Sequence, residues 1–129
     1  MLPGPFDDHM EREPTPQHWL IRASEVLRRV TSAESRFSAS LSVNEITMLA
    51  AADELEAATS EATMWLGGNP CPDRDLGGRV TLMLHTCAEV ALTAQRAITN
   101  PGTDVEGVIG RLGDLLAIID FHSQTLDAW

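Results

Sequence analysis

The segment TPQHWLIRASEVLRRVTSAESRF, residues 15–37, decides the fold of this chain. Threonine is favoured as the N-cap of a helix and proline at its first position, so Thr15 and Pro16 mark a helix start. Apolar residues then recur at alternating steps of four and three, which is the spacing of one helix face. These residues are Trp19, Ala23, Val26, Val30, Ala33 and Phe37. The segment predicts an amphipathic helix that ends near residues 38–40, with Leu20 and Leu27 widening its apolar face.

The same rhythm returns after a short break. Ser42-Val43-Asn44-Glu45 matches a capping box, in which a serine side chain caps the helix start and a glutamate bonds back to it. We expect a second helix from this motif to Gly67-Gly68, with Gly67 as a left-handed cap. Its apolar stripe is Met48, Ala51, Leu55, Ala58, Ala62 and Trp65.

Two further helices are expected in the C-terminal half. The third starts at Asp73 or Asp75, after a proline-rich loop, and stops at Asn100-Pro101-Gly102. The fourth starts at a second capping box, Thr103-Asp104-Val105-Glu106, and ends near His122. Their stripes are Leu76, Val80, Met83, Cys87, Val90, Ala94 and Ile98 in the third helix, and Val105, Ile109, Leu112, Leu116 and Ile119 in the fourth.

Helices joined by short connections favour antiparallel neighbours. The predicted fold class is therefore all-α, an antiparallel up-down four-helix bundle that forms a single domain over residues 15–129. Residues 1–14 are rich in proline and acidic side chains and show no periodicity, so we expect a flexible acidic tail. Leu126 and Trp129 are expected to pack back on the bundle as a short C-terminal tail.

The charge of the chain limits its partners. It has 19 acidic and nine basic residues and a net charge of −10. Such a surface repels phosphate groups, so we expect neither nucleic-acid binding nor association with an anionic membrane. No apolar run is long enough to span a bilayer and no signal peptide is evident, so we expect a cytoplasmic protein. Cys71 and Cys87 are too far apart along the predicted elements for a disulfide.

Charge also predicts which helices are neighbours. The first helix is rich in arginine, whereas the charged residues in 43–66 are all acidic. The two oppositely charged faces can therefore lie side by side, and each exposed ion pair would stabilise the contact by about 0–1 kcal/mol. The residues are Arg22, Arg28, Arg29 and Arg36 on one side, and Glu45, Asp53, Glu54, Glu56 and Glu61 on the other. The acidic helix also suggests a remote alternative function, an acidic mimic of nucleic acid.

Motifs for catalysis are absent from the sequence: there is no nucleophile elbow, Walker loop or dinucleotide fingerprint. We expect no catalytic residues and no cofactor. His85 and Glu89 lie four residues apart on one helix face, where they form either a solvated ion pair or half of a metal site. His122 is a second weak metal candidate, although the dipole at a helix C-terminus also explains it.

Self-association is the best-supported functional inference from the sequence. Leu82 and Leu92 lie off the main stripe of the third helix, near the His85 face, and a helix that is apolar on several sides is central or lies at an interface. Gly107, Gly110 and Gly113 in the fourth helix indicate either a close helix contact, inside the bundle or across a dimer, or a weak helix. We therefore expect a non-enzymatic interaction module that forms a homodimer and binds a protein partner. The alternative is a helical bundle that binds a metal or a small ligand.

Trp65-Leu66-Gly67 falls between two predicted helices and resembles the Trp-x-Gly turn of the small secreted helical hairpins of the WXG type. Those proteins are also acidic, helical and without a signal peptide. The resemblance covers three residues. The rest of the chain departs from the pattern, because a helix precedes the hairpin and there is no tyrosine for the C-terminal export signal. The sequence instead favours Trp65 as a side chain that closes one end of the bundle.

Overall fold

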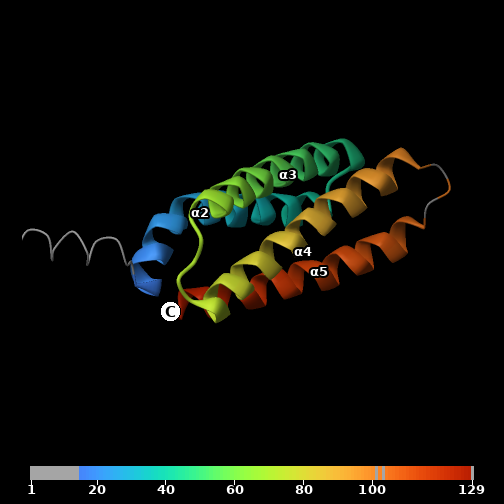
Figure 1. Ribbon diagram of the computed structural model, residues 1–129. Coiled ribbons are helices and arrows are strands. Elements are labelled where there is room, and N and C mark those ends of the chain that lie inside the picture. The colour runs from blue at the N-terminus through green and yellow to red at the C-terminus, as the bar shows by residue number, and fades with distance from the viewer. Residues whose placement is uncertain (1–14, 101, 103, 129) are drawn as a thin grey trace, which may run out of the picture.

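The computed structural model describes residues 15–100, 102 and 104–128, and this part of the chain is helical without any strand (Figure 1). Its four helices are α2 (Pro16–Ser40), α3 (Glu45–Gly68), α4 (Arg74–Thr99) and α5 (Val105–Asp127). The prediction of an all-α four-helix bundle is confirmed. The expected tail over residues 1–14 lies outside the described residues, and so does Trp129.

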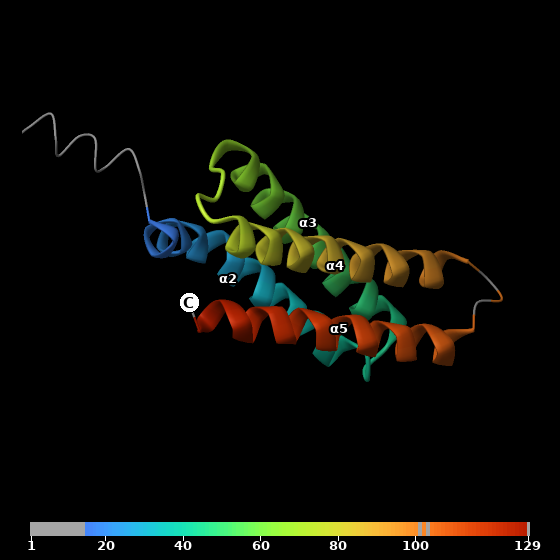
Figure 2. The same cartoon turned by 60° about the horizontal axis from the view of Figure 1, so that its bottom comes forward.

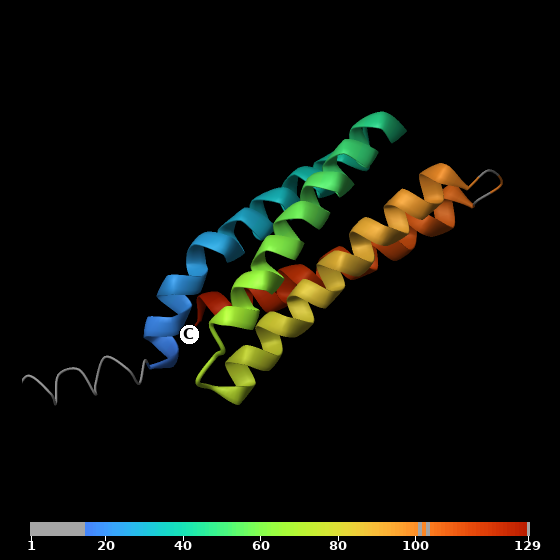
Figure 3. The same ribbon diagram turned by 45° about the horizontal axis from the view of Figure 1, so that its top comes forward.

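The helices run up and down in sequence order. Each packs along its length against the next, whereas α2 and α5 touch over only a short stretch. Figures 1 and 3 both show the C-terminal end of α5 beside the first turns of α2. Figure 2 shows α4 and α5 as two long neighbours joined by the turn at the far end of the molecule. The bundle is therefore closed by a contact between its first and last helices that is much shorter than the others.

The helix starts use short polar side chains, as expected, but not always the expected ones. Thr15 is the N-cap of α2, as predicted, and Asp73, one of the two expected starting residues, is the N-cap of α4. The cap of α3 is Asn44, not Ser42, because Asn44 is extended and its side chain accepts a hydrogen bond from the Thr47 amide at 2.8 Å. The cap of α5 is Asp104.

The helix ends also differ from the predictions. Gly67 is not a left-handed cap, because α3 continues through it to Gly68. Among the described residues, the one with a positive φ is Gly102, at 85°. The fourth helix does not end near His122 but continues to Asp127. The reason is that Leu126 packs back on the bundle, as expected, but does so as part of the helix, at the next position of the buried stripe after Ile119.

The core follows the predicted stripes with small rotations. Leu55, Cys87 and Leu116 share one buried cluster, against which Val26 packs as a half-buried residue while its neighbour Leu27 is buried. Ile109, which we placed on the buried stripe, is 38% exposed. Val108 packs against the core in its place.

Cys71 and Cys87 are both free thiols, as predicted. Among the described residues, none of the helices has the length and apolar character needed to cross a membrane.

Candidate interaction surface

The side of α4 that points away from the core carries two large apolar side chains. Leu82 is 50% exposed and Leu92 is 42% exposed. They line one shallow surface depression together with His85 and Glu89. Leu82 and Leu92 thus lie near the face of His85 and Glu89, as the sequence predicted, and we call these four residues the outer face of α4.

A groove between α3 and α4 adjoins this outer face. Leu92 and Ala88 form its α4 wall, and Met64 and Thr63 belong to its α3 wall. Met64 is 79% exposed, which is unusual for a methionine side chain. Exposed apolar groups from two helices therefore gather around Leu92.

Glu89 on the outer face forms an ion pair with Arg111 of α5. The Nη2 atom of Arg111 lies 3.1 Å from the Oε1 atom of Glu89. His85 is not the partner of Glu89, so the local ion pair that we considered for these two residues is not formed. The Glu89–Arg111 pair instead connects the outer face to the neighbouring helix.

The three weak metal candidates do not come together. His85 is exposed on the outer face of α4, Glu89 is bound to Arg111, and His122 lies on the inner side of α5 between Ile119 and Leu126. Among the described residues, no group of three or more histidine, cysteine, aspartate or glutamate side chains is arranged to hold a metal ion.

The three glycines of α5 have different surroundings. A Cβ atom at Gly107 would lie 2.6 Å from the carboxylate of Asp104, the N-cap, so this glycine makes room for the cap. Gly110 and Gly113 face open space. The possibility that they allow a close helix contact inside the bundle is therefore wrong, whereas a contact across a dimer stays a prediction.

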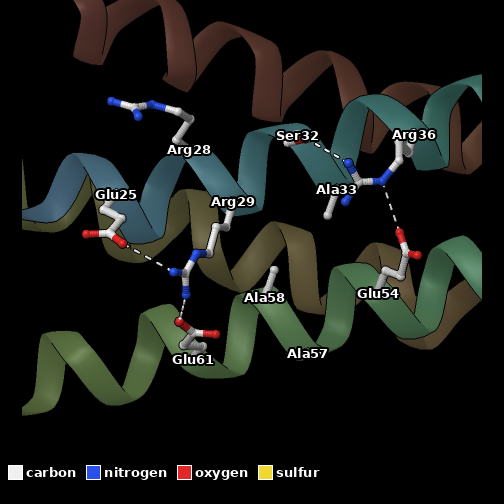
Figure 4. A pocket seen from close by; sticks show the side chains of 10 residues that line it. All are labelled: Glu25, Arg28, Arg29, Ser32, Ala33, Arg36, Glu54, Ala57, Ala58 and Glu61. Atoms are coloured by element: carbon white, nitrogen blue, oxygen red, sulfur yellow. Dashed lines mark hydrogen bonds and ion pairs between the residues drawn. The ribbon is translucent and has the colours of Figure 1, made fainter.

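The predicted charge pairing of the first two helices is confirmed (Figure 4). Arg29 bridges Glu25 on its own helix and Glu61 on α3, and the Nε atom of Arg36 lies 3.0 Å from the Oε2 atom of Glu54. Together with Arg28, these residues border a groove whose walls include three small alanines, and acidic and basic side chains balance there. The groove is thus a neutralised seam between α2 and α3.

One acidic residue that the charge pattern does not single out is buried in the bundle. Glu34 is 5% exposed, and its neighbour on α5 is Asp120, which is itself exposed. Burial is the main cause that raises the pKa of Glu34 to about 8, and the neighbouring Asp120 carboxyl group raises it further. The sequence did contain a signal, because Glu34 lies between Val30 and Phe37 at helical spacing and thus on the apolar stripe.

A buried thiol lies near Glu34. Cys87 of α4 is fully buried, and its pKa is raised to about 12 by burial and by the charge of Glu34. Its low tendency to ionise makes the thiol a poor nucleophile in the closed bundle. The interior thus contains one carboxyl group, that of Glu34, and one thiol, which the apolar pattern alone does not require.

Trp65 lies where the sequence placed it, at one end of the bundle. Its ring centroid is 5.7 Å from that of the buried Trp19. The position of Trp65 is therefore explained by its packing against Trp19 in the same chain.

Comparison with known proteins found no family model, no curated protein and no solved structure that matches this chain.

Proposed function

We propose that this chain is a non-enzymatic protein-interaction module that self-associates as a homodimer through the outer face of α4. The observation that carries the proposal is the exposure of Leu82 and Leu92 on one side of a helix that already buries its opposite side in the core. Apolar groups exposed in this way gain free energy when a partner covers them.

The surroundings of these leucines favour a protein surface as the partner. Leu92 stands between the outer face and the groove that holds Met64 and Ala88, so the exposed apolar groups are contiguous. Methionine adapts its shape to different partner surfaces because its side chain is unbranched and flexible. The exposed residues Ile21 and Ile46, by contrast, do not line any of the grooves described above.

Charge favours a second copy of this chain at this place. Two molecules of net charge −10 repel each other over most of their surfaces. On the outer face the charge of Glu89 is paired with that of Arg111, and Arg96 lies about two turns after Glu89 on the same helix. Two copies that meet on the outer face therefore bring together Glu89 carboxylates whose charge is already paired.

The oligomeric state tests the proposal directly. Light scattering coupled to size-exclusion chromatography, at several concentrations, should give twice the 14.0 kDa mass of the chain. The double variant Leu82→Glu/Leu92→Glu should run as a monomer with unchanged helical circular dichroism. The matched control Ile21→Glu/Ile46→Glu adds the same charges at exposed apolar positions elsewhere and should stay dimeric.

Two results would overturn the proposal. One is a wild-type chain that stays monomeric at the highest concentration. The other is a dimer that survives Leu82→Glu/Leu92→Glu. If such a dimer is lost with Phe121→Glu, the interface lies on α5, where Phe121 is 62% exposed.

A further inference from the structure

The exposed side of α4 carries a line of residues whose spacing is the same in both directions. It consists of Gly78, Leu82, His85, Glu89, Leu92 and Arg96, which are all exposed and are separated by alternating steps of four and three residues. The midpoint of the line is position 87, whose own side chain is buried in the core. If two copies of α4 meet in opposite directions about a two-fold axis at this level, each residue of the line lies opposite the residue at the mirrored position.

The mirrored positions carry side chains that suit one another. Leu82 mirrors Leu92, so an antiparallel pair of α4 helices covers an exposed leucine with a leucine at each end of the contact. Leu82 of the second copy then also lies at the groove that Leu92 shares with Met64. His85 mirrors Glu89, so an imidazole N–H of each copy can donate to the carboxylate of the other. The outer face of α4 is therefore complementary to itself in the antiparallel orientation.

Glu89 can accept this bond although it is already paired with Arg111. The Nη2 atom of Arg111 lies 3.1 Å from the Oε1 atom of Glu89, and the Glu89 side chain is still 48% exposed. A carboxylate accepts hydrogen bonds at both of its oxygens. The second oxygen of Glu89 thus stays available to His85 of another copy, while Arg111 holds the carboxylate in place.

The parallel orientation lacks this complementarity. About a two-fold axis that runs along the helices, each residue meets its own counterpart, so Glu89 would face Glu89 and His85 would face His85. Like charges placed opposite each other at an interface are unfavourable. The positions of these two residues therefore select the antiparallel orientation.

Small residues leave room for the same arrangement. Ala88 is exposed next to the midpoint of the line, where a short side chain lets two helices approach closely. Gly78 has open space around it and mirrors Arg96, whose long side chain needs that space. Asp75, exposed one turn before Gly78, offers a carboxylate to Arg96 of the second copy.

We propose that two copies of this chain pair in antiparallel fashion along α4, about a two-fold axis at the level of Ala88. Leu82 of each copy then meets Leu92 of the other, and His85 of each copy meets Glu89 of the other. This inference rests on the proposed homodimer and adds its orientation and its register. It also gives His85 a role, since the histidine recognises the second copy.

Cross-linking through single introduced cysteines tests the orientation. The background is Cys71→Ser, in which the remaining thiol of Cys87 is fully buried, and this background alone should give no covalent dimer. Ala88→Cys places the same residue of both copies near the axis, so it should form a disulfide with itself under mild oxidation. Leu82→Cys should not, because the two copies of position 82 are about 15 Å apart along the helices. A disulfide requires Cα atoms within about 7 Å.

A mixture of two variants tests the register. Leu82→Cys and Leu92→Cys proteins, one of them labelled with nitrogen-15, are mixed as reduced dimers, allowed to exchange subunits and then oxidised. Mass spectrometry should find the mixed covalent dimer in large excess over either covalent homodimer. Self-linking of Leu82→Cys that equals its linking to Leu92→Cys would exclude the antiparallel register and leave the homodimer itself standing.

Two further outcomes are decisive in different ways. A protein that is dimeric by light scattering but forms no disulfide at Ala88→Cys or in the mixture would show that the copies meet elsewhere or in another register. A wild-type chain that is monomeric at every concentration would remove the proposed function and this pairing together. The two failures are therefore distinguishable.

Substitution of His85 tests the polar contact. His85→Glu places a carboxylate opposite Glu89 at both ends of the two-fold contact, so the Kd of the dimer should rise by about tenfold. His85→Gln keeps an N–H donor and should change the Kd by less than about threefold. Equal Kd values for the two variants, measured by sedimentation equilibrium, would contradict the contact between His85 and Glu89.

Discussion

The indole Nε1 of Trp19 donates a hydrogen bond of 2.7 Å to the backbone carbonyl of Asn69. This bond links the first turns of α2 to the loop that follows α3. Arg22 strengthens the link, because its Nη2 atom lies 2.9 Å from the Asn69 Oδ1 atom. The N-terminal end of the bundle is thus fixed by polar contacts around a buried ring, with Trp65 packed beside it.

Replacement of Trp19 should reveal the value of this bond. Trp19→Phe keeps an aromatic ring but leaves a partly buried carbonyl without its donor and removes some packing, so the free energy of unfolding should fall by about 2–3 kcal/mol. Urea denaturation followed by circular dichroism measures this change. Trp65→Phe, at a half-buried ring, should cost clearly less, and an equal loss in the two variants would contradict the role of the Trp19 bond.

The Arg36–Glu54 ion pair should contribute little to stability. Both side chains are more than half exposed, at 58% and 57%, so water screens their attraction. A double-mutant cycle with Arg36→Ala and Glu54→Ala should give a coupling energy of about 0.2–1 kcal/mol that declines in 1 M salt. A coupling several times larger that does not respond to salt would mean that the pair is buried in solution.

The raised pKa of Glu34 makes stability depend on pH. Its pKa is 4.5 in the reference state and about 8 in the folded chain, so the folded chain holds a proton that the unfolded chain releases. This contribution is fully present below about pH 4.5 and is lost as pH rises towards about 8, by at most about 1.4 kcal/mol per pH unit. Denaturation of the wild type and of Glu34→Gln at pH 5 and pH 8 measures it.

The difference in stability between the two proteins should therefore shift in favour of Glu34→Gln as pH increases. Other carboxylates titrate in both proteins, so their effects cancel in the comparison. If the free energy of unfolding changed equally with pH in the two proteins, the pKa of Glu34 in the folded chain would be close to its reference value of 4.5.

The glycines of α5 should respond differently to alanine. Gly110 and Gly113 are exposed with open space around them, so each change to alanine should stabilise the monomer by about 0.5–1 kcal/mol through helix propensity. Gly107→Ala should give no such gain, because the new methyl group would displace the Asp104 cap, which is worth about 1 kcal/mol. Thermal unfolding of the three variants tests this order, and an equal gain at all three positions would contradict it.

Much of the fold could be predicted because it depends on local spacing. The stripe from Trp19 to Phe37 defines a helix with one apolar side, and short connections leave an antiparallel bundle as the way to bury such sides. The arginines of α2 and the acidic residues of α3 even indicated which helices pair. The Leu82 and Leu92 side of α4 was also visible, since a helical wheel places it opposite Cys87.

Other features could not be read from spacing. A capping pattern with several polar residues does not say which one takes the extended conformation, so Asn44 rather than Ser42 caps α3. The end of α5 depends on whether Leu126 finds a place in the core, which requires the positions of the other helices. Likewise, Glu89 had a candidate partner within its own helix but binds Arg111 from the next one.

The sequence alone determined the helices and the sides they bury, because the 3.6-residue repeat is a property of one segment at a time. Only the tertiary structure decided that Glu34 meets Asp120 and lies over Cys87. That encounter depends on how the first and last helices close the bundle, and no local pattern encodes the contact between two segments so far apart in the chain. Its chemistry follows from position, since an ordinary surface carboxyl acquires its altered acidity only when the packed helices remove it from water.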